Sequence, residues 1–284
     1  MQQKKIKELV NGAMMLALFG ILVLFDTYTG SMLNVILFML MPLPLLVYGL
    51  KNGLKASVIL WICEMILALF LGLPETIFYA LVAGLVSFVM IHGSRRHWSS
   101  QRLFLATLVM MIIAELASMT LLAGLFGYDI EREYASLVAY FPALANWVRL
   151  VIPLTAFVLG LMETYVLLNL AEVVCLRLKL SFVEHFHFVY LHFSKRSGLV
   201  LLLGCLGFLC PFDLAVFVGI ICYILLGIQG LSFLCLWAIF AQKRYAMLVF
   251  LLSLFIPVLN LYLVVFGLVD IFSEKRYKIM YNKR

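Results

Sequence analysis

The stretch LWICEMIL at residues 60–67 places a glutamate, Glu64, in the middle of a long apolar run. The stretch MIIAELA at residues 111–117 does the same with Glu115, and Glu163 stands inside a third run. An ionised acid at the centre of a bilayer costs about 2.5–3.5 kcal/mol on insertion scales. Such a side chain usually faces the interior of a helix bundle, where it is protonated, paired or hydrogen-bonded. The three glutamates therefore predict a helical membrane protein whose function lies in its polar interior.

The composition supports this class of protein. Of the 284 residues, 65% are hydrophobic and 12% are charged, whereas a soluble domain is about half apolar and a quarter charged. Apolar stretches of about 20 residues, the length of a spanning helix, recur along the chain. The runs are continuous rather than alternating, which indicates helices and not a barrel. We expect an all-α polytopic membrane protein with eight to nine transmembrane helices.

The apolar runs and the turns between them give the expected crossings. Two prolines, Pro42 and Pro44, should bend or break the second run, because proline removes a helix hydrogen bond. Pro257 and Asn260 interrupt the last run, and the run 199–210 is short, so eight and nine crossings both remain open. The expected runs are 9–25, 32–50, 54–73, 77–91, 103–126, 147–170, 199–210, 214–241 and 247–271.

This pattern divides the chain into three parts. Residues 1–178 are expected to form a six-helix membrane core, and 179–198 a cytoplasmic or interfacial loop rich in Phe, Tyr and His. Residues 199–284 should supply the C-terminal membrane helices and a basic tail.

The basic residues predict the orientation. With the N-terminus in the cytoplasm, the opposite side of the membrane receives only Arg132 and Arg149 before the tail, and it also collects most loop acids. This asymmetry follows the positive-inside rule. It accounts for the net charge of +7, which therefore does not indicate nucleic-acid binding. The expected location is the bacterial inner (cytoplasmic) membrane, with several crossings. The cytoplasmic side receives Lys or Arg at 4, 5, 7, 51, 55, 95, 96, 102, 177, 179, 195, 196, 243 and 244.

The three glutamates are the leading candidates for a binding site. Glu64, Glu115 and Glu163 are expected at similar depth, so inward-facing side chains would form one acidic cavity. Such a cavity suits a cationic substrate, a coupling cation or a proton relay. Asn34, Asn169 and Gln229 are further polar interior candidates, and for each a structural hydrogen bond is the alternative to a ligand-binding role. The alternative is structural: a protonated glutamate can make one hydrogen bond between helices.

Ala13 and Ala17 are candidates for docking a partner helix. Small residues four positions apart allow another helix to approach closely, although packing within the chain uses the same pattern. The expected surroundings are the lipid bilayer and protein partners in the membrane, such as an ATPase or scaffold module.

No motif predicts enzymatic chemistry. The sequence shows no P-loop, hydrolase, dinucleotide-binding or zinc signature, and its six cysteines include no CxxC pair. His185 and His187 lack a third ligand of known geometry. We therefore expect a protein that is not an enzyme and that holds no cofactor or metal. Any pump function would need a separate ATPase subunit.

Several motifs, taken together, resemble the YybS-like predicted membrane proteins of bacteria. They occupy residues 11–18, 42–45, 48–56, 229–232, 267–271 and 275–276. The resemblance covers nearly the whole chain and implies a membrane protein without specifying an activity.

The first six predicted spans are also distantly similar to the S components of energy-coupling-factor vitamin transporters. In that fold an Ala-xxx-Ala surface on the first helix docks the scaffold subunit, and Ala13 and Ala17 match this pattern. The resemblance implies a membrane-embedded substrate-binding component that acts with partners. Because this chain has additional C-terminal spans, a scaffold role like that of the cell-shape protein MreD remains the alternative.

Overall fold

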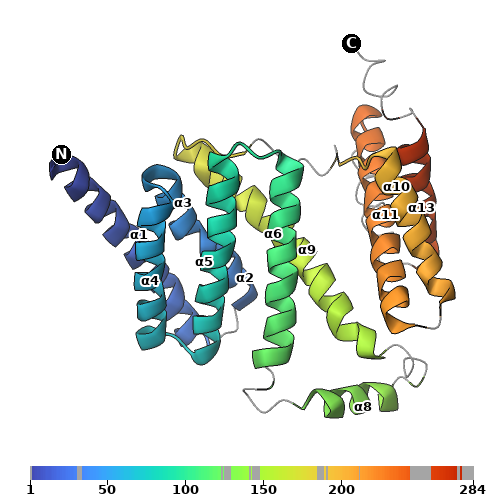
Figure 1. The fold of residues 1–284 in the computed structure, drawn as a ribbon, viewed down its shortest axis with the longest axis horizontal. Coiled ribbons are helices and arrows are strands. Elements are labelled where there is room, and N and C mark those ends of the chain that lie inside the picture. Colours follow the sequence, from blue (N-terminus) through green and yellow to red (C-terminus); the bar gives the residue numbers. More distant parts are fainter. Residues whose placement is uncertain are drawn as a thin grey trace. The chain divides into compact units, whose positions relative to one another are not determined.

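The computed structural model describes residues 2–30, 34–122, 124, 129–140, 142, 148–183, 189, 191–210, 212–243, 257–273 and 276. All regular structure within these residues is helical (Figure 1). The chain forms two compact units, Met1–His185 and Phe186–Arg284. The division falls inside the segment 179–198, for which we predicted a loop.

Unit 1 (Met1–His185) is a bundle of apolar helices. Five of its helices are long and apolar enough to cross a membrane, and α2 and α3 together form another apolar passage. A sixth candidate span, α11, belongs to unit 2 (Phe186–Arg284), so the described residues contain six candidate spans. The helices of unit 1 are α1 (Gln2–Tyr28), α2 (Asn34–Leu40), α3 (Pro42–Asn52), α4 (Leu54–Leu71), α5 (Pro74–Arg95), α6 (Ser100–Ala117), α8 (Ile130–Tyr140) and α9 (Val148–Arg177).

The second apolar run is broken between α2 and α3, as its prolines predicted. Met41 separates the two helices, and Pro42 opens α3. The Ser87 hydroxyl of α5 donates to the Pro42 carbonyl at 2.8 Å, which ties the break to a neighbouring helix. Gly53, with φ +100°, then forms the tight turn into α4, because its conformation is one that side chains disfavour.

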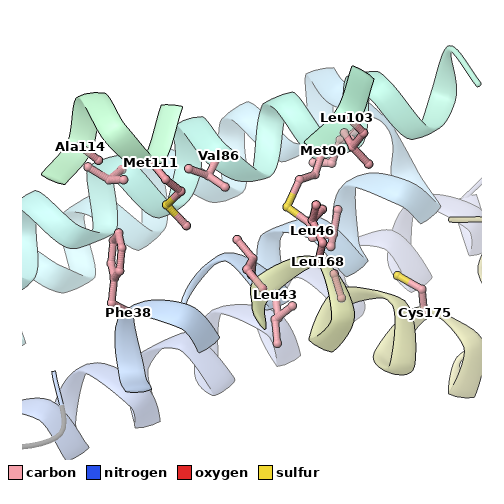
Figure 2. Close-up of a cluster of buried hydrophobic side chains, with 14 residues drawn as sticks. Phe38, Leu43, Leu46, Val86, Met90, Leu103, Met111, Ala114, Leu168 and Cys175 are labelled. Carbon is pink, nitrogen blue, oxygen red and sulfur yellow. The ribbon is translucent and has the colours of Figure 1, made fainter. Parts of the chain in front are cut away.

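A central apolar cluster holds unit 1 together (Figure 2). It joins α2, α3, α5, α6 and α9, and α5 is the most enclosed of the candidate spans in this unit. Lipid tails are as apolar as these side chains, so moving the side chains out of lipid provides no hydrophobic driving force. The cluster therefore stabilises the unit through close packing. Its labelled members in Figure 2 are Phe38, Leu43, Leu46, Val86, Met90, Leu103, Met111, Ala114, Leu168 and Cys175.

Helix α8 runs across the end of unit 1 at which α6 ends and α9 begins (Figure 1). Its N-terminus is capped by Asp129, whose carboxylate accepts the backbone N–H groups of Glu131 at 3.1 Å and Arg132 at 3.3 Å. Its charged side chains Glu131 and Arg132 are exposed, whereas Leu137 and Val138 are half-buried. This arrangement is typical of a helix in the membrane interface.

Unit 2 contains α10 (Lys195–Cys205), the 3-10 turn η4 (Leu206–Leu209), α11 (Asp213–Phe240) and α13 (Pro257–Phe272). Helices α11 and α13 touch through backbone at Gly230 and Gly267. The backbone nitrogen of Gly267 lies 2.8 Å from where a Cβ at Gly230 would stand, and a Cβ at Gly267 would meet the Leu226 carbonyl. The expected start of the last crossing, at 247, lies outside the described residues, so the number of crossings and the re-entrant hairpin stay predictions.

The first prediction tests the Gly230–Gly267 contact. Gly230→Leu forces a side chain into the backbone of α13, which should cost at least about 1–3 kcal/mol of stability. At about 2–4 °C per kcal/mol, the unfolding temperature should fall by several degrees. A thiol-reactive dye can follow unfolding, because Cys222 and Cys235 are buried in unit 2.

The matched control is Val218→Leu, which enlarges an exposed position of the same helix and should leave the unfolding temperature unchanged. Equal stability of Gly230→Leu and the wild type would show that α11 and α13 are not in backbone contact.

Candidate functional site

The carboxyl groups of Glu115 and Glu163 lie next to each other between α6 and α9, close enough to interact directly. Glu163 is only 5% exposed, and Glu115 is half-buried. Both residues lie within candidate membrane spans. The structure thus brings together two of the three glutamates that the sequence singled out.

A close crossing of α6 and α9 positions the carboxyl groups of Glu115 and Glu163 beside each other. A Cβ at Gly160 of α9 would lie 3.1 Å from the backbone nitrogen of Ile112 on α6, so this glycine lets the helices approach. The two helices run in opposite directions (Figure 1). Glu115 and Glu163 each follow the crossing by one turn, and helical side chains lean toward the N-terminus of their helix. Both glutamates therefore lean back toward the same crossing.

The helix that carries Glu115 changes its geometry directly after this residue. Helix α6 ends at Ala117 and continues as a π-helical segment, η1 (Ser118–Leu122). Within this segment the Thr120 hydroxyl donates to the Leu116 carbonyl at 2.6 Å. Single π-helical turns are rare and are frequent at functional sites, because they release backbone groups from the regular ladder.

The pair has a definite proton requirement. Two carboxyl groups hydrogen-bond to each other only when at least one of them carries a proton, because an ionised carboxylate is an acceptor alone. One oxygen of Glu163, Oε2, is buried and accepts no hydrogen bond from the described residues. With one proton the pair carries one negative charge in an apolar region, which a second proton or a cation would neutralise.

Glu64 does not join this pair, so the expectation of one cavity lined by all three glutamates is wrong. Glu64 is 2% exposed on α4, and this helix packs mainly against α1, α3 and α5. The helices that pack most against α4 do not include α6 or α9, which carry Glu115 and Glu163. The physical reason is the order of the helices, since a similar depth in the membrane does not make two helices neighbours.

The other candidate residues lie away from the pair. The Asn169 amide donates to the Tyr165 carbonyl of its own helix at 2.6 Å, close to the helix surface. Asn34 begins α2, but its side chain lies outside the described residues. Ala13 and Ala17 are exposed on an apolar face of α1. His185 and His187 lie outside the described residues. Among the residues that the structure does describe, no cluster of metal-ligating side chains occurs.

Unit 2 contains a buried ionic network that the sequence analysis missed. Asp270 and Arg276 are 0% and 2% exposed, and the Arg276 Nε donates to both Asp270 oxygens at 3.0 Å. The Arg276 guanidinium also donates to the Val189 carbonyl at 3.0 Å and to the Ser232 hydroxyl at 3.2 Å. The sequence feature that could have indicated this ion pair is an acid, Asp270, near the end of the last apolar run, followed by the basic tail that contains Arg276.

Gln229 connects this ion pair to the segment that precedes α10. Its amide donates to Asp270, and its side-chain oxygen accepts the backbone N–H of Phe193 at 3.2 Å. His192 lies beside the same amide, with 3.3 Å between the Gln229 Nε2 and the His192 Nδ1. Every group of the network has a partner, which indicates a structural role in holding the 189–193 segment against α11 and α13.

A second buried acid, Asp26, joins α1 to the turn between α4 and α5. Its Oδ2 accepts the Thr76 hydroxyl at 2.7 Å, and the neighbouring Thr27 hydroxyl donates to the Leu71 carbonyl at 3.0 Å. Thr76 stands in the first turn of α5, where the helix dipole favours a negative charge. Asp26 therefore positions this end of the bundle.

One comparison with known proteins finds a match. A family model described as a predicted membrane protein (DUF2232) matches residues 17–140, from within α1 to the end of α8. The matched part includes Glu64 and Glu115 but not Glu163. No curated protein and no solved structure matches the chain.

The match supports a multi-pass membrane protein and names no activity. The YybS-like resemblance and the resemblance to S components stay predictions.

The second prediction tests the ionic network. Asp270→Asn leaves the Arg276 guanidinium buried without its counter-charge, which should cost about 3–5 kcal/mol. The double variant Asp270→Asn/Arg276→Met removes both charges and should regain part of that stability, because an apolar side chain replaces the unpaired cation. Thermal unfolding of the full chain measures both effects, and a double variant less stable than the single one would contradict the assignment of a buried ion pair.

Proposed function

We propose that the protein is a membrane-embedded binding or transport-related component, and that Glu115 and Glu163 bind its cationic ligand. The proposal includes the bacterial cytoplasmic membrane, a cytoplasmic N-terminus and action with partner proteins. The observation that carries it is the pair of adjacent carboxyl groups between two candidate spans.

The chemistry of the pair favours a ligand with one positive charge. A singly protonated pair carries one negative charge, and its carboxylate oxygens can accept hydrogen bonds from an ammonium group. The surrounding apolar side chains strengthen this attraction, since they exclude water. The π-helical segment after α6 supports the same site, because its altered backbone permits local rearrangement when a ligand enters.

The layout of unit 1 supports the proposed orientation. Lys51, Arg95 and Arg177 stand in the last turns of α3, α5 and α9, which reach the same end of the unit as the start of α1 (Figure 1). The opposite end carries the end of α1, the first turn of α5 and α8 (Figure 1). The positive-inside rule assigns the basic end to the cytoplasm.

The alternative function is a scaffold that binds membrane partners without a small ligand. Ala13 and Ala17 lie on an exposed apolar face of α1, as this alternative requires. Lipid tails cover such a face equally well, so its exposure does not distinguish a partner from the bilayer. The carboxyl pair has no comparable explanation by lipid, and it therefore favours the ligand-binding function.

The third prediction tests the carboxyl pair directly. In sodium-free buffer, at least one member of a panel of small organic ammonium ions should raise the unfolding temperature of the purified protein. Glu115→Gln and Glu163→Gln should each weaken that ligand at least tenfold, because an amide carries no negative charge. This loss corresponds to about 1.4 kcal/mol of binding free energy.

Glu131→Gln provides the matched control, since it removes an exposed carboxyl group on α8 and should leave the ligand response unchanged. If both pair variants fold and respond like the wild type, the carboxyl pair is not the binding group. If no ammonium ion stabilises the wild type, the scaffold function takes precedence.

A further inference from the structure

Glu64 is a buried acid that the proposed function does not use. It is 2% exposed, and its Oε1 has no hydrogen-bond partner among the described residues. It belongs to the buried stripe of α4, together with Ser57, Leu60 and Ala68. A carboxyl group in this setting needs a proton or another positive charge to offset the loss of hydration.

The register of the α3–α4 hairpin places Glu64 opposite Pro42. The two helices turn at Gly53, and a Cβ at Gly49 would lie 2.5 Å from the Ser57 hydroxyl oxygen. Residues of α3 and α4 that are the same number of positions from Gly53 therefore stand at the same level of the hairpin. Pro42 and Glu64 are such a pair.

Two apolar clusters confirm this register on either side of Glu64. Leu60, one turn before Glu64, shares a buried cluster with Leu45 of α3. Ala68, one turn after Glu64, shares another cluster with Met41 at the helix break. Glu64 therefore lies at the level of the break between α2 and α3.

The break offers carbonyl oxygens at this level. Pro42 and Pro44 have no N–H, so the carbonyls of Phe38 and Leu40 lack the hydrogen bond that a regular helix would give them. Helix carbonyls point toward the C-terminus, which directs these two toward the break. The Pro42 carbonyl is already occupied by the Ser87 hydroxyl.

We propose that Glu64 and the carbonyls freed at the α2–α3 break bind a small monovalent metal cation of the Na⁺ class. Carboxylate and carbonyl oxygens are the ligands that hard cations prefer. One carboxylate and neutral carbonyls carry a single negative charge, which a monovalent ion cancels and a divalent ion overcompensates. Broken helices provide such ligands in membrane transporters, where unwound carbonyls coordinate the coupling ion. This inference does not rest on the proposed function, because Glu64 lies apart from the Glu115–Glu163 pair.

The fourth prediction is a Na⁺-dependent stability of the full chain. At constant ionic strength, replacement of the large ion Cs⁺ by Na⁺ at about one hundred times its dissociation constant should raise the unfolding temperature by about 5 °C or more. The thiol-reactive dye on buried cysteines serves as the readout. Glu64→Gln should abolish the Na⁺ shift, whereas Glu75→Gln, at the start of α5, should retain it.

A second variant tests the site without changing the carboxyl group. Pro42→Ala restores an N–H that can occupy the Phe38 carbonyl, and it should reduce the Na⁺ shift. The same measurement overturns the proposal if Na⁺ and Cs⁺ give equal unfolding temperatures for the wild type. It also overturns the proposal if Glu64→Gln or Pro42→Ala folds and keeps the full shift. A protonated Glu64 with a purely structural hydrogen bond gives the first of these results. The ammonium panel in sodium-free buffer is a separate measurement, so the two proposals can fail independently.

Discussion

The absence of hydrogen-bonding solvent in a bilayer is the constraint on which this structure depends. Polar groups inside the bundle need partners from the protein, and several of the buried acids find one on another helix. Glu115 and Glu163 use each other, Asp270 uses Arg276 and Gln229, and Asp26 uses Thr76. These partnerships join helices that are separated in the sequence, so they fix which helices become neighbours as well as neutralising charge.

Close backbone approach is the second requirement, because short polar side chains meet only where helices nearly touch. Gly160 brings α9 onto α6 beside the Glu115–Glu163 pair. In unit 2, Gly230 follows Gln229 directly, and Gly267 precedes Asp270 by one turn. The glycine contact between α11 and α13 therefore stands next to the ionic network, and the packing of the helices and the pairing of the charges depend on each other.

The sequence predicted the local structure well and the pairing poorly. Hydropathy located α4 and α11 to within two residues at most of their observed ends, and Pro42 correctly marked the break before α3. These features depend only on residues that are close to one another in the sequence. The separation of Glu64 from Glu115 depends on the order of helices in space, which composition and spacing do not encode. The role of Arg276 was missed for a related reason, since a basic tail residue is ordinarily solvated and only the fold shows it buried beside Asp270.

The two units surround their buried acids in chemically different ways, and this difference is the basis of both proposals. Asp270 is balanced by a guanidinium that belongs to the chain and keeps its charge at any physiological pH. The Glu115–Glu163 pair requires a proton, and Glu64 has an oxygen without a protein partner, so their balancing charges come from outside the chain. A charge that comes from outside can be exchanged, whereas Arg276 cannot leave. Both proposed sites, for the ammonium ligand and for the monovalent cation, therefore lie in unit 1, whereas the ion pair of unit 2 is complete within the chain.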